Sequence, residues 1–359
     1  MIGADWEITK RCNQRCSFCL NNSGPEHRDI LTTDDCFRIV DQLVEIGVFH
    51  VVITGGEPFV RPDIAEVLIY AASKNLIWTV TSNGSALTDS LIDKLSPIRS
   101  HFRSIQISLH ALDAVTYEGY EISPTDLAAS KANIIKLVKA GFVTTVICLF
   151  KGDNEAGVLE VYDWCSGHGV DGFISSQIKS SGRAIDSFSQ FGSEKAKWIQ
   201  LLSALYDKKN ESVGPDLLIS EPALFQKYAN KRAGVDLIKY SCPAGTDTLM
   251  IKGNGDVYPC PFISEDCSGS IVAQEFRAGN IRESSLQQLM RTQAFARFNS
   301  NVESAQIFKG GVDQKCVSCG EHKAGNCRPC QLAKSDCHDS VRATTDFLRQ
   351  KTFRIATVR

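Results

Sequence analysis

Three cysteines near the start of the chain have the spacing of a metal-binding loop. Cys12, Cys16 and Cys19 form the pattern CxxxCxxC, and Phe18 precedes the third of them. Three thiolates in one short loop can hold three irons of a [4Fe–4S] cube, which leaves the fourth iron open to a small molecule. Zinc would need a fourth ligand close by, and the nearest histidine, His27, lies eight residues beyond Cys19. The pattern favours a chemically active iron–sulfur cluster over a zinc knuckle or buried free thiols.

A second motif lies at the end of an apolar segment. Residues 48–53 predict a buried strand, and Gly55, Gly56, Glu57 and Pro58 follow it. Glycines at the end of a strand let the backbone approach a ligand closely. In parallel sheets, ligands bind at this end of the strands. An ordinary strand-to-helix turn is the alternative for this motif taken alone.

The two motifs together resemble those of the radical S-adenosylmethionine (radical SAM) superfamily. That family combines a CxxxCxxC loop, with an aromatic residue before the third cysteine, and a GGEP motif. The resemblance implies that the open iron binds S-adenosylmethionine (SAM) through the amino and carboxylate groups of SAM. An electron from the cluster then splits SAM into methionine and a 5′-deoxyadenosyl radical, which abstracts a hydrogen atom from the substrate.

The same resemblance implies which residues would hold SAM. The glycines and the glutamate of GGEP would bind its amine, and two residues that end the third predicted strand would contact its methionine or ribose part. A serine that ends the next strand and an arginine beyond the sixth strand complete the set. Simpler interpretations stay open, because Ser-Asn-Gly is a common turn, and no residue is identified as a catalytic acid or base. The cofactor-binding candidates are Gly55, Gly56, Glu57, Ser82, Asn83, Ser108 and Arg183.

Eight of the fourteen cysteines lie after residue 240, in a region rich in glycine and proline. Clustered cysteines in a reducing compartment indicate metal binding rather than disulfides. Eight is also the number of ligands that two complete [4Fe–4S] clusters need. In its first cysteine, its GxxxxC motif and its later CxxC pair, the region resembles the SPASM domain, the auxiliary-cluster extension of many radical SAM enzymes. A zinc-stapled domain is the alternative.

The SPASM resemblance implies a division of these cysteines between two auxiliary [4Fe–4S] clusters, although the spacings after Cys319 depart from the family pattern. In anaerobic sulfatase-maturating enzymes, an aspartate follows the cysteine that matches Cys260 and serves as a base. Pro261 stands there in this chain and cannot take a proton. The first cluster would be held by Cys242, Cys260, Cys267 and Cys330, and the second by Cys316, Cys319, Cys327 and Cys337.

Strand and helix signals alternate through the first half of the chain, which predicts an α/β fold with a mainly parallel sheet. Six such units fit a partial (β/α)₆ barrel, the fold that the resemblance also implies, followed by a small loop-rich, cysteine-rich Fe–S domain. We expect strands at 6–9, 48–53, 77–81, 104–109, 142–150 and 172–177. The predicted domains are a barrel at 1–185, a bridging or insertion segment at 186–240, the auxiliary cluster domain at 241–340 and a tail at 341–359.

Composition limits the other partners. The 359 residues carry 39 basic and 41 acidic side chains, a net charge of −2, which gives no bulk-charge argument for nucleic-acid or membrane binding. The start of the chain lacks the basic and apolar regions of a signal peptide, and no apolar stretch is long enough for a membrane helix. We expect a cytoplasmic protein.

These features predict a radical SAM oxidoreductase that oxidises or cross-links a ribosomally made peptide. The enzyme alternative is a small-molecule dehydrogenase or a tetrapyrrole-modifying enzyme of the same superfamily. The alternative that is no enzyme is an iron–sulfur electron carrier, which would need no SAM site. An external reductant such as flavodoxin or ferredoxin would supply electrons. Cys12 lies too near the start for a preceding peptide-recognition domain, so we expect either a separate recognition protein or a role for residues 180–240 in binding the peptide.

Overall fold

The computed structural model of the chain describes residues 3–113, 122–178, 182–184, 195–211, 213–219, 244–263 and 270–303. These residues form a mixed α/β fold around one sheet, with the strand order β10-β9-β8-β1-β2-β3-β4-β5-β6-β7. All neighbouring strands from β8 to β7 in this order are parallel, whereas β9 is antiparallel to β8 and to β10. The predicted α/β fold class with a parallel, barrel-like sheet is confirmed.

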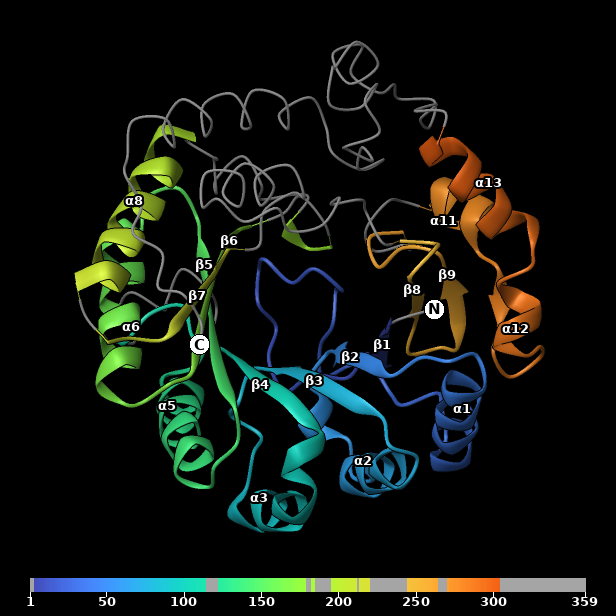
Figure 1. Cartoon of the computed structure of the whole chain (residues 1–359), viewed down its shortest axis with the longest axis horizontal. Coiled ribbons are helices and arrows are strands. Elements are labelled where there is room, and N and C mark those ends of the chain that lie inside the picture. Colours follow the sequence, from blue (N-terminus) through green and yellow to red (C-terminus); the bar gives the residue numbers. More distant parts are fainter. Residues whose placement is uncertain are drawn as a thin grey trace.

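The strands of this sheet are short and lie mostly where the sequence predicts them. The sheet curves, and helices α1, α2, α3, α5, α6 and α8 lie on its outer side (Figure 1). The strands are β1 Gly3–Thr9, β2 His50–Gly55, β3 Ile77–Ser82, β4 Phe102–Ser108, β5 Thr144–Phe150, β6 Gly172–Gln177, β7 Asp216–Ile219, β8 Thr248–Ile251, β9 Asp256–Tyr258 and β10 Gly279–Asn280.

Local signals account for where several of the helices begin. The first helix has a capping box, in which Thr32 accepts from the backbone N–H of Asp35 while the Asp35 carboxylate accepts from the backbone N–H of Thr32. The helices on the outer side are α1 Thr33–Glu45, α2 Ile64–Ser73, α3 Asp89–Leu95, α5 Pro124–Lys139, α6 Glu155–Gly167 and α8 Lys195–Glu211. The 3₁₀ helices are η1 Pro58–Val60 and η2 Ser96–His101, and the later helices are α11 Ser270–Phe276, α12 Leu286–Leu289 and α13 Gln293–Glu303. No helix in these described parts is long and apolar enough to cross a membrane.

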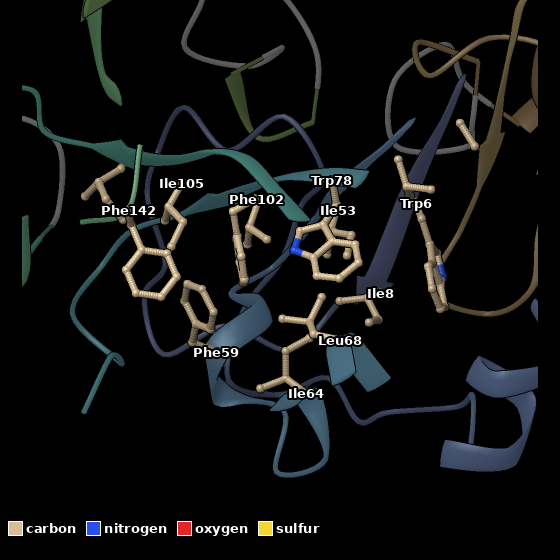
Figure 2. Packing of buried hydrophobic residues seen from close by; sticks show 14 of the residues in the cluster. Trp6, Ile8, Ile53, Phe59, Ile64, Leu68, Trp78, Phe102, Ile105 and Phe142 are labelled. Carbon is tan, nitrogen blue, oxygen red and sulfur yellow. The ribbon is translucent and has the colours of Figure 1, made fainter. Parts of the chain in front are cut away.

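The main hydrophobic core lies between the outer face of the sheet and the helices. Trp6 and Trp78, from β1 and β3, are each 1% exposed and lie near Ile53 of β2 and Leu68 of α2 (Figure 2). Successive side chains of a strand point to opposite faces. The residues between these core positions therefore face the inside of the curve. On β1 these residues are Gly3 and three polar ones, Asp5, Glu7 and Thr9.

Two strand pairings extend the sheet beyond the six predicted strands. β7 lies within the segment predicted to be a bridge or insertion, and it pairs in parallel with β6. On the other edge, β8 pairs in parallel with β1, with Trp6 opposite Ile251 and Asp5 opposite Met250. The strands that follow residue 240 therefore continue the sheet of the barrel, because they bond directly to its first strand.

A buried ion pair joins the two sides of the β1–β8 pairing. Lys252 Nζ donates to Glu7 Oε2, and the backbone N–H of Gly253 donates to Glu7 Oε1 at 3.0 Å. Glu7 and Lys252 are 1% and 6% exposed. Removing one member of such a pair leaves the other charge buried without its partner, which is strongly destabilising.

We therefore expect Lys252→Met to lower the free energy of unfolding by about 3–5 kcal/mol. Urea unfolding of the reconstituted protein would measure this, with the exposed Lys94→Met on α3 as the matched control. The double variant Glu7→Gln/Lys252→Met should recover much of the loss, since it leaves no unpaired buried charge. A Lys252→Met variant as stable as Lys94→Met would contradict the role of the pair.

Candidate functional site

The three cysteines of the CxxxCxxC loop lie directly after β1, at the carboxyl edge of the parallel strands. The loop folds back on itself, because Cys12 N donates to Gly24 O at 3.1 Å and Cys19 N donates to Cys16 O at 3.2 Å. Two backbone N–H groups point at sulfur: Gln14 N lies 3.4 Å from Cys12 Sγ, and Ser23 N lies 3.4 Å from Cys19 Sγ. Amide N–H groups aimed at sulfur favour the charged thiolate form.

The thiols are close enough to influence one another. Burial is the main reason why the pKa of Cys12 and that of Cys16 are raised to about 12; Glu57 and Cys19 contribute to the rise at Cys12, and the two other thiols contribute to the rise at Cys16. Deprotonation therefore needs a metal, as is usual for cysteine ligands. Within the described ranges, no three Cys, His, Asp or Glu side chains converge on a position for one metal ion. A cube needs a different arrangement, because each thiolate binds an iron of its own. Three thiols in one loop, two of them approached by amide donors, fit that requirement.

Arg61 closes the base of the cysteine loop. Its Nη1 donates to Ile8 O at 3.2 Å, before the loop, and its Nη2 donates to Leu31 O at 2.9 Å, after the loop. The guanidinium is 3% exposed and its Nε lies 2.7 Å from Asp63 Oδ1. The role of this residue was not predicted from the sequence. The sequence feature that could have indicated its role is an arginine three residues after Pro58, directly after the apolar residues Phe59 and Val60.

The glycines of the GGEP motif contact the chain's own backbone. Gly56 N donates to Thr9 O at 2.7 Å, and Glu57 N donates to Arg11 O at 2.9 Å. A Cβ on Gly56 would lie 2.1 Å from Arg11 O, and one on Gly55, whose φ is +147°, would lie 2.2 Å from Thr9 O. The sequence motif predicts that these glycines make room for a ligand. The structure shows that they also make room for the start of the cysteine loop.

The Glu57 carboxylate is fully buried between the second and third strands. It accepts hydrogen bonds from Phe59 N at 3.0 Å, Ser82 Oγ at 2.8 Å and Asn83 N at 2.6 Å. Burial raises the pKa of Glu57 to about 7, although the three donors act in the opposite direction. A carboxylate has about four acceptor positions, so one position remains for a further donor.

Asn83 connects this carboxylate to the cysteine loop. Its side-chain Nδ2 donates to Asn13 Oδ1 at 2.9 Å and lies 3.9 Å from Cys12 Sγ. Ser82, which the sequence analysis grouped with Asn83, instead turns its hydroxyl to Glu57. Ser108 ends β4 at the same edge of the sheet and is partly buried. The structure thus brings the GGEP turn, the end of β3 and the cysteine loop together.

Arg183 also contacts the cysteine loop. Its Nε donates to Cys16 O at 2.8 Å, its Nη1 donates to Asn22 Oδ1 at 3.2 Å, and its backbone N–H donates to Cys19 O at 3.0 Å. Gly182 precedes it with a φ of +57°, and a Cβ there would lie 2.1 Å from Cys19 O. The Nη2 of Arg183 is buried and has no hydrogen-bond partner in the described part of the chain. Arg183 therefore holds the loop with part of its guanidinium and keeps one donor unused.

The aromatic residue of the cysteine loop packs against a histidine. The rings of Phe18 and His110 meet edge to face, with their centroids 5.1 Å apart. His110 is 3% exposed, and burial lowers its pKa to about 3. Its Nδ1 accepts from the backbone N–H of Leu149 at 3.3 Å, so this imidazole is neutral at physiological pH.

Among the predicted auxiliary ligands, the described residues include Cys260. It is 7% exposed and belongs to a second, smaller core with Met250, Tyr258, Phe276 and Phe298. Pro261 follows it, partly buried. The remaining predicted ligands lie outside the described residues, and so does the predicted tail at 341–359: Cys242, Cys267, Cys316, Cys319, Cys327, Cys330 and Cys337.

Two protein-family models match the chain. The model of the radical SAM superfamily matches residues 6–165, and the model of the SPASM iron–sulfur cluster-binding domain matches residues 242–320. Together the matches span more than half of the chain, which belongs to the radical SAM superfamily and carries a SPASM domain. Its cofactors are accordingly a [4Fe–4S] cluster with SAM, and auxiliary iron–sulfur clusters. The chain is an enzyme of this superfamily.

Individual relatives resemble the chain over most of its length. Mycofactocin maturase MftC from Mycobacterium tuberculosis is 29% identical over 92% of this chain and 78% of that protein. An AdoMet-dependent heme synthase from Nitratidesulfovibrio vulgaris is 24% identical over 90% of this chain and 86% of that protein. The crystal structure of Streptococcus suis SuiB bound to SAM superposes with a TM-score of 0.71 at 20% identity, covering 90% of this chain and 71% of that one, which confirms the fold.

The contacts of Arg61 generate a prediction about the cysteine loop. Arg61→Lys should release the loop ends, because a single ammonium cannot serve two carbonyl oxygens and a carboxylate in the geometry of a guanidinium. We expect a loss of stability of about 2–3 kcal/mol and reduced retention of the N-terminal cluster, measured by thermal unfolding and by cluster absorbance after anaerobic reconstitution. Arg99→Lys, the same change at an exposed position, is the control. Unchanged cluster retention in Arg61→Lys would show that the loop does not depend on this residue.

Proposed function

We propose that the chain is a radical SAM oxidoreductase that modifies a ribosomally made peptide by oxidation or cross-linking. In this proposal Cys12, Cys16 and Cys19 hold the SAM-binding cube. When bound, the cluster and SAM supply a 5′-deoxyadenosyl radical that removes a hydrogen atom from the substrate. The chain's own residues hold and orient SAM, and they exclude water from the site.

The observation that carries the proposal is the link between Glu57 and Cys12. Asn83 donates its backbone N–H to the Glu57 carboxylate at 2.6 Å, and its side-chain nitrogen lies 3.9 Å from Cys12 Sγ. A carboxylate with one acceptor position left therefore lies beside the cysteine loop. An ammonium group placed there would form a charge-assisted hydrogen bond and would lower the raised pKa of Glu57. This supports the SAM amine as the ligand of Glu57.

The other cofactor-binding candidates take narrower roles in the proposal. Ser82 orients the Glu57 carboxylate, and the backbone of Gly55 and Gly56 positions the cysteine loop beside it. The unused Nη2 of Arg183 is a donor for the SAM carboxylate. Ser108 ends β4 at the same edge and completes the set.

Charge on the inner face of the sheet favours a peptide over a tetrapyrrole. MftC is a maturase by name, and another relative is a heme synthase. Haem carries two propionate carboxylates, which need cationic partners. Among the described strands β1–β6 and β8 and the residue that directly follows β8, the inner-facing cation is Lys252, and Glu7 already pairs with it. Asp5 adds a negative charge to the same face, which disfavours a carboxylate-bearing substrate.

Further partners belong to the same proposal. The eight late cysteines would hold two auxiliary [4Fe–4S] clusters, which would accept the second electron of the oxidation. An external reductant such as flavodoxin or ferredoxin would supply the first electron. A separate recognition protein, or residues 180–240, would bind the leader of the peptide, and the reaction would take place in the cytoplasm.

The test combines the enzyme, SAM, a reductant and any short peptide that a neighbouring reading frame encodes. We expect 5′-deoxyadenosine and a peptide product that is lighter by two hydrogens. The triple variant Cys12→Ala/Cys16→Ala/Cys19→Ala should give neither, and its iron content should fall from about twelve to about eight per chain. The triple variant Cys36→Ala/Cys148→Ala/Cys165→Ala is the matched control, because these three thiols are buried in the main core.

Several results would count against this function. If the Cys12, Cys16 and Cys19 variant still released 5′-deoxyadenosine, the assignment of the cube would be wrong. Consumption of a haem precursor in place of the peptide would support the tetrapyrrole alternative. Stoichiometric zinc in the natively purified protein would rule out two auxiliary iron–sulfur clusters.

Glu57→Gln tests the SAM amine site separately. Glutamine has nearly the shape of glutamate, but its N–H₂ group would face hydrogen-bond donors that bond to a carboxylate oxygen in the wild type. It also removes the negative charge that would pair with an ammonium group. We expect SAM affinity to fall by about tenfold, or about 1.4 kcal/mol, together with some loss of stability. Asp35→Asn is the control, because this buried carboxylate also accepts a backbone N–H but lies at the start of α1. Titrating SAM into both variants decides, since a purely structural role would lower stability in both and leave the affinity unchanged.

A further inference from the structure

Asp5 lies on the inner face of β1, on the side opposite the main core. Its neighbours Ala4 and Trp6 belong to the hydrophobic core on the outer side. Glu7, which shares the face of Asp5, reaches Lys252 on the inner side of β8. The alternation of a strand therefore places the Asp5 carboxyl inside the curve of the sheet, where it is partly buried.

The inner-facing residues around Asp5 leave its carboxyl without a partner. Asp5 pairs through the backbone with Val52 of β2 and Met250 of β8, and both have apolar side chains. The nearest polar side chains on the next strands bond elsewhere, since His50 Nε2 lies 3.0 Å from Thr79 Oγ1. Within the described ranges, the Asp5 carboxyl makes no hydrogen bond or ion pair.

The charges on this face do not neutralise Asp5. Lys252, which directly follows β8, is bonded to Glu7. Burial and the positive charge of Arg103 lower the pKa of His50, so its imidazole is neutral at pH 7. Burial also raises the pKa of Asp5 to about 6. Asp5 is thus a carboxyl withdrawn from water, with no counter-charge on the neighbouring strands.

Glu7 shows what a structural carboxylate on this face looks like. It lies two residues along the same strand, and the fold gives it both an ammonium and a backbone N–H. A buried carboxylate without such partners lowers stability, because the charged form loses its hydration. A purely structural role therefore does not account for Asp5.

We propose that Asp5 binds a cationic group of the substrate, a primary ammonium or a guanidinium, inside the barrel. A cation beside Asp5 would form a charge-assisted hydrogen bond and would favour the ionised carboxylate. This inference deepens the proposed function and rests on it for the kind of substrate. In a peptide substrate the group is a lysine or arginine side chain or the amino terminus.

Carbodiimide labelling of the wild-type holoenzyme tests the site directly. A water-soluble carbodiimide with glycinamide as nucleophile converts accessible carboxyls to amides, and peptide mass spectrometry locates them. The first tryptic peptide, residues 1–10, contains Asp5 together with Glu7 as an internal reference. Propylguanidinium is the cationic probe, and propylurea, at matched ionic strength, is its neutral isostere. Asp93, exposed on α3, is the control carboxyl.

We expect Asp5 to be labelled in the absence of probe. At about 50 mM propylguanidinium its labelling should fall by about sixfold, as a dissociation constant of about 10 mM implies, and propylurea should not protect it. Equal labelling with both probes would overturn the inference. So would failure to label Asp5 without probe, since the carboxyl would then be closed to ligands. The result does not depend on SAM cleavage, so a failure of the proposed function shows separately, in the assay for 5′-deoxyadenosine.

Discussion

The contact between two stretches of backbone is the constraint on which the site depends. The turn after β2 donates two backbone N–H groups: Gly56 N to the carbonyl oxygen of Thr9, which ends β1, and Glu57 N to that of Arg11, at the start of the cysteine loop. This pairing leaves no room for a Cβ on Gly56. The cysteine loop and the GGEP turn, distant in sequence, therefore form one rigid unit. Arg61 closes the unit at its base, where it bonds carbonyl groups on both sides of the loop.

How much of this the sequence could predict depends on the kind of interaction. The six parallel strands follow from apolar segments bounded by breakers, and the cysteine loop follows from residue type and spacing. The partners of Arg61 and Arg183 could not be predicted, because both arginines donate to backbone carbonyl oxygens. Every residue has such an oxygen, so the residue type of the partner carries no signal. The contact of Gly55 and Gly56 with the chain's own backbone could not be predicted for the same reason, so the motif predicted only a ligand beside them. β7 escaped prediction since its four residues carry little periodic signal.

The pairing of β8 with β1 has a consequence for the auxiliary region. Neighbouring strands lie about 4.8 Å apart, so the backbones of β9 and β1 lie about 10 Å apart across β8. Cys260 follows β9 by two residues and lies in a core on the inner side of β8, with Met250 and Tyr258. The position of this cysteine relative to the cysteine loop is thus set by hydrogen bonds within a sheet and by the Glu7–Lys252 pair. A flexible linker between two separate domains would not set it in this way.

Three buried or partly buried carboxyls on or next to β1 and β2 differ in the hydrogen-bond donors and cations that the fold supplies to them. Glu7 receives an ammonium from Lys252 and a backbone N–H from Gly253. Glu57 receives three neutral donors, which do not offset its burial, and its pKa is raised to about 7. Asp5 receives none from the residues that the structure describes, and burial raises its pKa to about 6. A fold that places a lysine beside one carboxylate could place a cation beside the other two as well. The two that receive no cation from the described residues are the carboxyls at which we propose that a charge comes from outside the chain: Glu57 beside the cysteine loop, and Asp5 deeper inside the barrel.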